Sequence, residues 1–185
     1  MYKKRIPTPA EIRDLLLYDP ETGILTWLPR HEKYFSNALQ APKCNARWAG
    51  RQAFTCLHHR GYYMGMIFGK HLLAHRVAYA YMTGEWPPEE VDHINHERWD
   101  NRWCNLRAAT RAQNSSHRKP QGLSRYLGVY MNPTKAKWSA KISKHGIKKH
   151  LGNFIDEEDA ARAYDRAAIE MHKEFANLNF KTGDE

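Results

Sequence analysis

The sequence predicts an α+β protein with two structured regions. Apolar residues at helical spacing alternate with short runs of strand type, and apolar residues make up 42% of the 185 residues, enough for packed cores. A stretch containing Pro, Gly and Ser separates a smaller C-terminal region from the rest. The predicted organisation is therefore a domain over residues 1–118, a linker over 119–124 and a domain over 125–180.

The N-terminal region is expected to begin with a helix. Thr8 fits its N-cap and Pro9 its first position, with Ile12 and Leu15 on one face. A second helix is expected over 75–82, ended by Thr83 and Gly84. Strands are expected at 24–27, 52–54, 62–68 and 71–73, with a tight turn at 69–70 and an irregular segment at 30–47.

The C-terminal region is expected to form a small three-stranded antiparallel sheet packed on one helix. Strands are predicted at 127–132, 137–143 and 147–152, and the acids of 156–159 open a helix. Trp138 alternates with the apolar positions of its strand and is expected in the core. The opposite, polar face carries Tyr130, Asn132, Lys137, Lys141, Ser143, Lys148 and His150. We expect this face to bind DNA; ordinary solvated lysines are the alternative.

The charge distribution indicates a polyanionic partner, and we expect double-stranded DNA. The formal net charge is +9, residues 33–84 contain seven Lys or Arg and no acid, and residues 119–155 contain eight and no acid. Aromatic residues lie between the basic ones, as in surfaces that neutralise phosphates and stack on bases.

Several classes of protein are excluded by composition. No run of 18 apolar residues predicts a membrane span, and no apolar signal core follows the basic N-terminus. The three cysteines form no CxxC pair, so neither a disulfide framework nor a four-cysteine zinc site is expected. We expect an intracellular protein of the host cytoplasm, with no membrane and no small-molecule cofactor as partner, and a monomer rather than an oligomer.

The residues that could perform chemistry gather between 91 and 118. Asp92 and His93 lie on a predicted strand, a second strand covers 106–108, and a capping box of Thr110 and Gln113 starts a helix at Arg111. A strand, a loop, a strand and a helix could bring Asp92 and Asn114 to one cation. Their oxygen donors suit one divalent ion, Mg²⁺ first and Mn²⁺ as the alternative, completed by waters and a phosphate. His93 is the candidate general base, and Asn105 is expected to hold its ring.

Each of these residues has another reading. Asp92 could instead cap a turn, and Asn101 could be a ligand, although an Asn that stabilises a turn is preferred. His117 lies one helical turn from Asn114 and is a lower-ranked alternative ligand. His75 and Arg76 are expected to be structural or to contact DNA.

The segment resembles the HNH nuclease family, in the form seen in phage homing endonucleases. His93, Asn105 and Asn114 match the signature residues, and Asp92 matches the preceding carboxylate. Ala74-His75-Arg76-Val77 and Asp100-Asn101-Arg102 match further, as does the run from Tyr18 to Trp27. The resemblance implies a ββα-metal site that leaves a 5′-phosphate and a 3′-hydroxyl.

The C-terminal region resembles the plant ethylene-response-factor (APETALA-type) DNA-binding domain. The matching segments are 126–129, 137–140, 151–154, 158–168 and 176–180. In that family the three strands lie in the major groove. Leu127, Tyr130, Asn132 and His150 replace its usual base-reading residues, so the plant recognition sequence is not expected here.

The combined hypothesis is a metal-dependent, homing-type DNA endonuclease of a phage or mobile element. One site per chain predicts a nick in one strand, directed by the C-terminal sheet; a double-strand break would need two sites. The alternative is a non-catalytic DNA-binding regulator that uses the HNH region as a scaffold. Action on RNA or branched DNA is a third possibility; the sheet type disfavours RNA, because the RNA major groove is too narrow to read.

Overall fold

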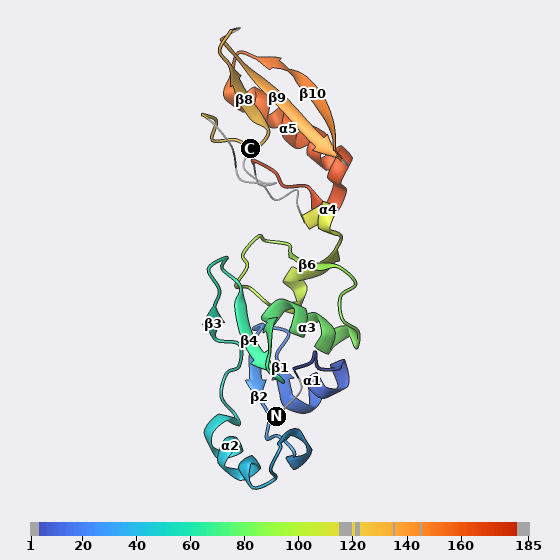
Figure 1. Ribbon diagram of the computed structural model, residues 1–185. Coiled ribbons are helices and arrows are strands. Elements are labelled where there is room, and N and C mark those ends of the chain that lie inside the picture. Colours follow the sequence, from blue (N-terminus) through green and yellow to red (C-terminus); the bar gives the residue numbers. More distant parts are fainter. Residues whose placement is uncertain (1–3, 115–119, 121–122, 135, 145, 181–185) are drawn as a thin grey trace. The chain divides into compact units, whose positions relative to one another are not determined.

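The chain folds into two units of mixed helix and strand, as the computed structural model shows (Figure 1). It describes residues 4–114, 120, 123–134, 136–144 and 146–180. The units are Met1–Ala109 and Thr110–Glu185. The mixed class is confirmed, while the boundaries 1–118, 119–124 and 125–180 stay a prediction. No helix among the described residues is long and apolar enough to cross a membrane.

The first unit opens with helix α1 (Pro9–Leu15), as predicted. Thr8 and Glu11 form a capping box at its start, which satisfies free backbone N–H groups. Strands β1 (Leu16–Tyr18) and β2 (Leu25–Trp27) pair antiparallel around the turn at 19–24. Ile12, Leu15 and Val77 belong to the buried apolar cluster that joins these elements to helix α3.

A second layer contains the sheet β3 (Cys56–Leu57), β4 (Tyr63–Ile67) and β5 (Lys70–Leu73), followed by α3 (Ala74–Thr83). The β4–β5 turn uses Phe68 and Gly69, both at positive φ, so it lies one residue before the predicted turn at 69–70. Helix α3 packs on α1 and ends at Gly84, whose φ of 80° suits glycine.

Two predictions for this unit are wrong. The segment 30–47 is not irregular, because it contains a short 3-10 helix, η1 (Glu32–Tyr34), and most of helix α2 (Gln40–Trp48). Helix α2 buries only Ala41 and has no side-chain cap, so it lacks the usual sequence signals. The predicted strand at 52–54 is reduced to one bridge between Gln52 and Thr26, since Phe54 has a φ of 57°.

A two-stranded hairpin closes the first unit. Strand β6 (Glu90–His93) pairs antiparallel with β7 (Leu106–Ala109). The short helix η2 (Trp103–Asn105) directly precedes β7 in the chain. Asp92 lies opposite Arg107, and His93 lies opposite Leu106. Both strands were predicted.

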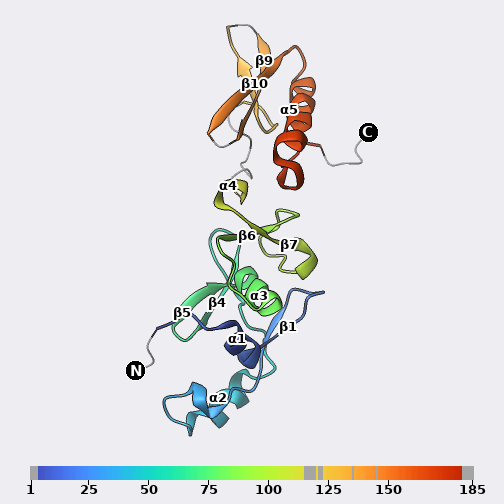
Figure 2. The same ribbon diagram turned by 90° about the vertical axis from the view of Figure 1, so that its right-hand side faces the viewer.

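The second unit starts with α4 (Arg111–Asn114), where Thr110 and Gln113 form the predicted capping box. Strands β8 (Val129–Asn132), β9 (Lys137–Lys144) and β10 (Ile147–Phe154) form an antiparallel sheet in the order β10-β9-β8. Helix α5 (Glu157–His172) begins after Asp156, lies along one side of this sheet (Figure 2) and is followed by η3 (Lys173–Phe175). Val129 and Ala140 pack on its alanines, and Trp138 joins this cluster, as expected.

Candidate active site

Strand β6 presents two buried functional groups at adjacent positions. Asp92 is 2% exposed and His93 is 4% exposed. The Oδ2 atom of Asp92 accepts hydrogen bonds from Arg107 Nε at 2.8 Å and Nη2 at 2.7 Å. Because the two residues face each other across the hairpin, this ion pair ties the strands together as well as neutralising a buried carboxylate.

The ring of His93 is oriented by Asn101. Its Nε2 atom lies 3.4 Å from Asn101 Oδ1, while Asn101 Nδ2 donates to the carbonyl of Trp99 at 3.2 Å. The second bond fixes the amide so that its oxygen faces the ring, which places the proton of a neutral imidazole on Nε2. Nδ1 then carries the lone pair that could accept a proton.

Burial lowers the pKa of His93, and the nearby Arg98 charge acts in the same direction. Asn101, Asp92 and Asp100 oppose this effect without reversing it. The ring is therefore neutral at pH 7, which is the form that a general base requires.

Asn105 contacts the loop between the strands rather than the ring. Its Oδ1 accepts from the backbone N–H of Asn95 at 2.8 Å, and its Nδ2 donates to the carbonyl of Asp100 at 2.8 Å. The expected contact between Asn105 and His93 is thus made by Asn101. The sequence had suggested Asn101 as a turn residue, with metal ligation as the alternative, and its position at the Asp-Asn-Arg turn was the available signal.

The turn at 19–23 supports this loop. Tyr18 Oη donates to the backbone carbonyl of Asn101 at 2.6 Å, and the N–H of Trp103 donates to the carbonyl of Pro20 at 2.9 Å. A Cβ at Gly23 would lie 2.5 Å from the carbonyl carbon of Asn101, so only glycine permits this close approach. The segment 18–27 therefore positions the residue that orients His93.

Two further rings surround His93. The ring centroid of His75 lies 4.9 Å from that of His93 in an edge-on arrangement, and Tyr62 lies 5.0 Å from His75 and 5.9 Å from His93. Nδ1 of His75 is buried and has no hydrogen-bond partner within the part of the chain that the structure describes. Burial lowers the pKa of His75 to about 3. The structural reading of His75 fits this position, on a buried face of α3.

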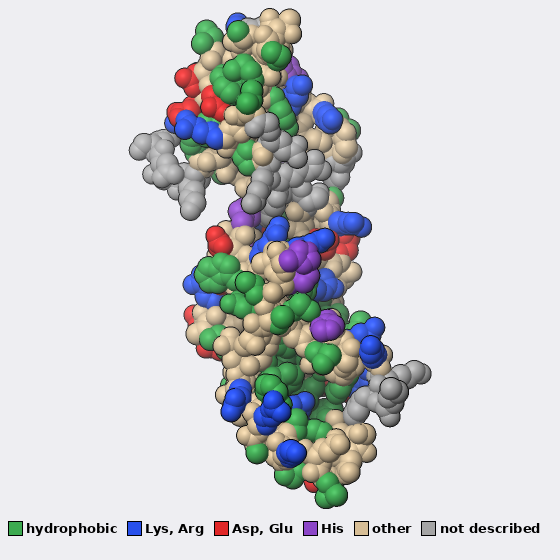
Figure 3. Space-filling model, turned by 60° about the vertical axis from the view of Figure 1, so that its left-hand side comes forward, with side chains coloured by type: hydrophobic (Ala, Val, Ile, Leu, Met, Phe, Trp, Pro, Cys, Tyr) green, Lys and Arg blue, Asp and Glu red, His purple; other side chains and the backbone are tan. Residues whose placement is uncertain are grey.

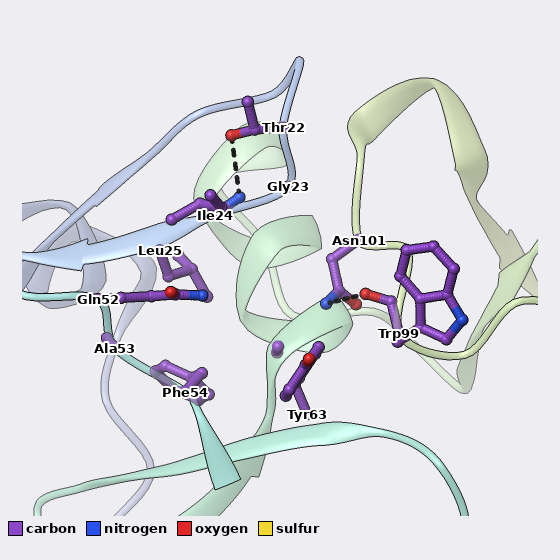
Figure 4. Close-up of a pocket in the computed structure, with 11 residues that line it drawn as sticks. Thr22, Gly23, Ile24, Leu25, Gln52, Ala53, Phe54, Tyr63, Trp99 and Asn101 are labelled. Carbon is purple, nitrogen blue, oxygen red and sulfur yellow. Dashed lines mark hydrogen bonds between the residues drawn. The ribbon is translucent and has the colours of Figure 1, made fainter. Parts of the chain in front are cut away.

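A pocket of about 190 Å³ adjoins the other side of Asn101. Figure 4 shows Asn101 and Trp99 on one side of it, Gln52 and Phe54 on the other, and Tyr63 between them. Thr22 and Gly23 of the β1–β2 turn also line the pocket.

The remaining candidate ligands belong to the second unit or lie outside the described residues. Asn114 is the last residue of α4, and its backbone N–H bonds to the carbonyl of Thr110. His117 falls outside the described residues. Across the ranges that the structure describes, no group of three or more His, Cys, Asp or Glu could hold a metal. Asp92 and Asn114 are oxygen donors, and this donor chemistry fits a hard cation that keeps most of its waters.

The register of the C-terminal sheet places the seven predicted DNA-binding residues on one face. Directly paired residues of antiparallel strands share a face, and Val129 with Ala140 marks the face against α5. The pairs on the opposite face are Asn132 with Lys137, His150 with Lys141 and Lys148 with Ser143, together with Tyr130, which pairs with Ser139.

Comparisons with known proteins identify the N-terminal class. Residues 72–116 match the family model described as HNH endonuclease. An uncharacterized HNH endonuclease of Acanthamoeba polyphaga mimivirus is 35% identical over 121 residues, which cover 64% of this chain and 63% of that protein. These matches support the nuclease class predicted from the sequence. The residues that match the family model include Asp92, His93, Asn105 and Asn114.

Plant proteins give partial matches. A rice (Oryza sativa subsp. japonica) AP2/ERF and B3 domain-containing protein is 45% identical over 60 residues, 32% of this chain and 16% of its own length. An AP2-like ethylene-responsive transcription factor of Arabidopsis thaliana is 40% identical over 73 residues, 36% of this chain and 15% of its own length. The chain thus spans less than two thirds of the length of each relative named here.

Proposed function

We propose that this protein is a metal-dependent DNA endonuclease that hydrolyses phosphodiester bonds with His93 as the general base. The observation that carries the proposal is the neutral, buried imidazole of His93, bonded at Nε2 to Asn101 and adjacent to Asp92. The HNH match over residues 72–116 supports the same reaction class.

In the proposed reaction, Nδ1 of His93 takes a proton from a water molecule. The water oxygen forms a bond to phosphorus, and the bond between phosphorus and O3′ breaks. O3′ takes a proton from solvent, so the products are a 5′-phosphate and a 3′-hydroxyl. An imidazole that is neutral near pH 7 can accept this proton directly, because it does not first have to lose one.

Asp92, with Asn114 as its partner, would hold one divalent cation, Mg²⁺ or alternatively Mn²⁺. HNH nucleases typically use such an ion. When bound, it would stabilise negative charge on the phosphate and the leaving oxygen. Asn105 would contribute by fixing the loop that carries Asn101, through its bonds at Asn95 and Asp100.

We further propose that the basic sheet face directs the nuclease to duplex DNA. Tyr130, Asn132, Lys137, Lys141, Ser143, Lys148 and His150 share that face, and the AP2-type names of the plant relatives support this role. One site per chain, acting as a monomer, would nick one strand. The mimivirus relative supports a viral origin. The homing type remains part of the proposal that was made from the sequence.

One observation favours the alternative of a non-catalytic regulator. The Asp92–Arg107 ion pair satisfies the carboxylate without a metal, as a scaffold would require. Plasmid cleavage separates the two proposals.

The test incubates supercoiled plasmid with wild-type protein in Mg²⁺, in Mn²⁺ and in EDTA, together with His93→Ala. Exposed His71, on β5, provides the control His71→Ala. We expect open-circular plasmid from wild type and His71→Ala in either metal, and none in EDTA or from His93→Ala. Absence of nicking by wild type in both metals would favour the regulator.

A further inference from the structure

The β6–β7 segment contains an arginine without a carboxylate partner among the described residues. Its three arginines are Arg98, Arg102 and Arg107. Arg102 pairs with Asp100 at 2.6 Å, and Arg107 pairs with Asp92 at 2.7 Å. Arg98 is exposed and forms no ion pair with any carboxylate of the described residues. Its charge therefore remains available to a ligand.

Neighbouring groups hold Arg98 in place. Its Nη1 donates to the backbone carbonyl of Arg60 at 3.0 Å, and its guanidinium carbon lies 5.2 Å from the ring centroid of Tyr62. Gly61 lies beside the arginine stem, since a Cβ there would be 3.9 Å from both Cβ and Cδ of Arg98. Because the side chain is already ordered, less conformational entropy would be lost when its remaining N–H groups bind a ligand.

This position is close to the candidate base. Tyr62 neighbours both groups: its ring centroid lies 5.2 Å from the guanidinium carbon of Arg98 and 5.9 Å from the ring centroid of His93. Burial is the main cause of the lowered pKa of His93, and the charge of Arg98 is near enough to lower it further. Figure 3 shows Lys, Arg and His side chains close together on the visible face of the first unit.

We propose that Arg98 is a phosphate-binding residue of the nuclease site, donating from Nε and Nη2 to the non-bridging oxygens of the phosphodiester. This inference rests on the proposed function. A planar guanidinium matches two phosphate oxygens at once, and those oxygens gain negative charge as the water oxygen attacks phosphorus. Arg98 would thus bind the phosphate of the substrate, and would bind the more negatively charged transition state more strongly than the substrate.

The test compares Arg98→Gln and Arg98→Lys with the control Arg60→Gln, which keeps the backbone carbonyl that Arg98 uses. A fluorescent 30-base-pair duplex measures affinity by anisotropy in EDTA at two salt concentrations, and single-turnover nicking in Mg²⁺ measures the chemical step. We expect Arg98→Gln to bind more weakly, with a salt slope reduced by about one unit, and to nick about 10²-fold more slowly. Arg98→Lys keeps the charge but not the planar guanidinium that contacts two oxygens. It should therefore retain affinity for the duplex and recover only part of the nicking rate. Arg60→Gln should nick at the wild-type rate.

Failure of this inference is distinguishable from failure of the proposed function. Active wild type with an equally active and tight-binding Arg98→Gln would overturn the role of Arg98 and leave the nuclease intact. Inactive wild type with weakened duplex binding by Arg98→Gln alone would reject the nuclease and retain the phosphate contact. Equal binding by inactive wild type and Arg98→Gln would reject both. Should Arg98→Gln lose its thermal unfolding transition, Arg98→Lys decides, since an unchanged nicking rate there contradicts the two-oxygen contact.

Discussion

Asn101 orients His93, the proposed general base. The amide is buried, its Nδ2 is occupied by the carbonyl of Trp99, and its Oδ1 faces the ring. A residue that fixes the tautomer of a functional histidine commonly contributes 10- to 100-fold, as an order of magnitude.

We therefore predict that Asn101→Ala lowers the single-turnover nicking rate about 10- to 100-fold. Duplex affinity in EDTA should change little, because Asn101 faces His93 and the loop backbone. Exposed Asn37, which bonds only its own loop at Leu39, supplies the control Asn37→Ala. An Asn101→Ala protein that nicks at the control rate would exclude this orienting role.

The buried histidines predict acid sensitivity. Burial lowers the pKa of His75 from 6.5 to about 3 and also lowers the pKa of His93. The unfolded chain then binds protons that the folded chain does not, so stability falls as the pH drops below about 6.5. The loss approaches about 1.4 kcal/mol per pH unit for each such group. His75→Phe should reduce the difference in melting temperature between pH 7 and pH 5, whereas His71→Phe should leave it unchanged. An unchanged difference in His75→Phe would show that His75 does not cause the effect.

At the scale of elements, the β1–β2 turn supports the loop of the site. Gly23 has a φ of 73° and contacts the backbone of Asn101, while Gly50 has a φ of 78° and nothing within 4 Å of a Cβ. Both glycines thus have a positive φ, and only Gly23, which is buried where Gly50 is exposed, makes a close backbone approach.

We predict that Gly50→Ala costs about 1–2 kcal/mol of stability through backbone strain alone. Gly23→Ala should cost more and should also slow nicking, because the added methyl group displaces Asn101. Thermal melting and single-turnover rates provide the measurements. Equal effects of the two substitutions on both quantities would mean that the contact with Asn101 is unimportant.

The sheet of the second unit offers a matched pair of lysines. Lys148 lies opposite Ser143 on the outer face, and its neighbour Lys149 lies opposite Ile142 on the face toward α5. We predict that Lys141→Gln with Lys148→Gln weakens duplex binding and reduces the salt slope by about two units, one for each phosphate contact. Lys149→Gln should have a smaller effect, and an equal loss would indicate general charge attraction rather than a binding face.

The sequence predicted those helices and strands that carry local signals. Capping boxes at Thr8 and Thr110 and alternation along β9 located helices and strands, because these signals are local. Helix α2 was missed because it has no such cap. The strand predicted at 52–54 does not form because Phe54 takes a positive φ, and the ring of Phe54 packs against Gly65, which is distant in sequence. The contact between Asn101 and His93 depends on a loop held by Tyr18 and Gly23, which are distant in sequence and give no local signal.

At the scale of the molecule, the charge divides between the predicted regions. Residues 1–118 carry 17 basic and 11 acidic residues, a net +6, and residues 119–185 carry 12 and 9, a net +3. The acids of the C-terminal region gather on α5 and leave the outer sheet face basic. Each region therefore carries a net positive charge suited to a polyanion, while the residues of the proposed chemistry, Asp92 and His93, belong to the N-terminal region alone.

Chemical rescue tests the central claim that His93 is the base of a nuclease. Single-turnover nicking of a labelled duplex in Mg²⁺ is measured for wild type and for His93→Ala, with and without added imidazole. We predict that His93→Ala lowers the nicking rate about 10²–10⁴-fold and that imidazole, which replaces the missing proton acceptor, restores part of it. Nicking by His93→Ala at the wild-type rate without imidazole would show that His93 is not the base.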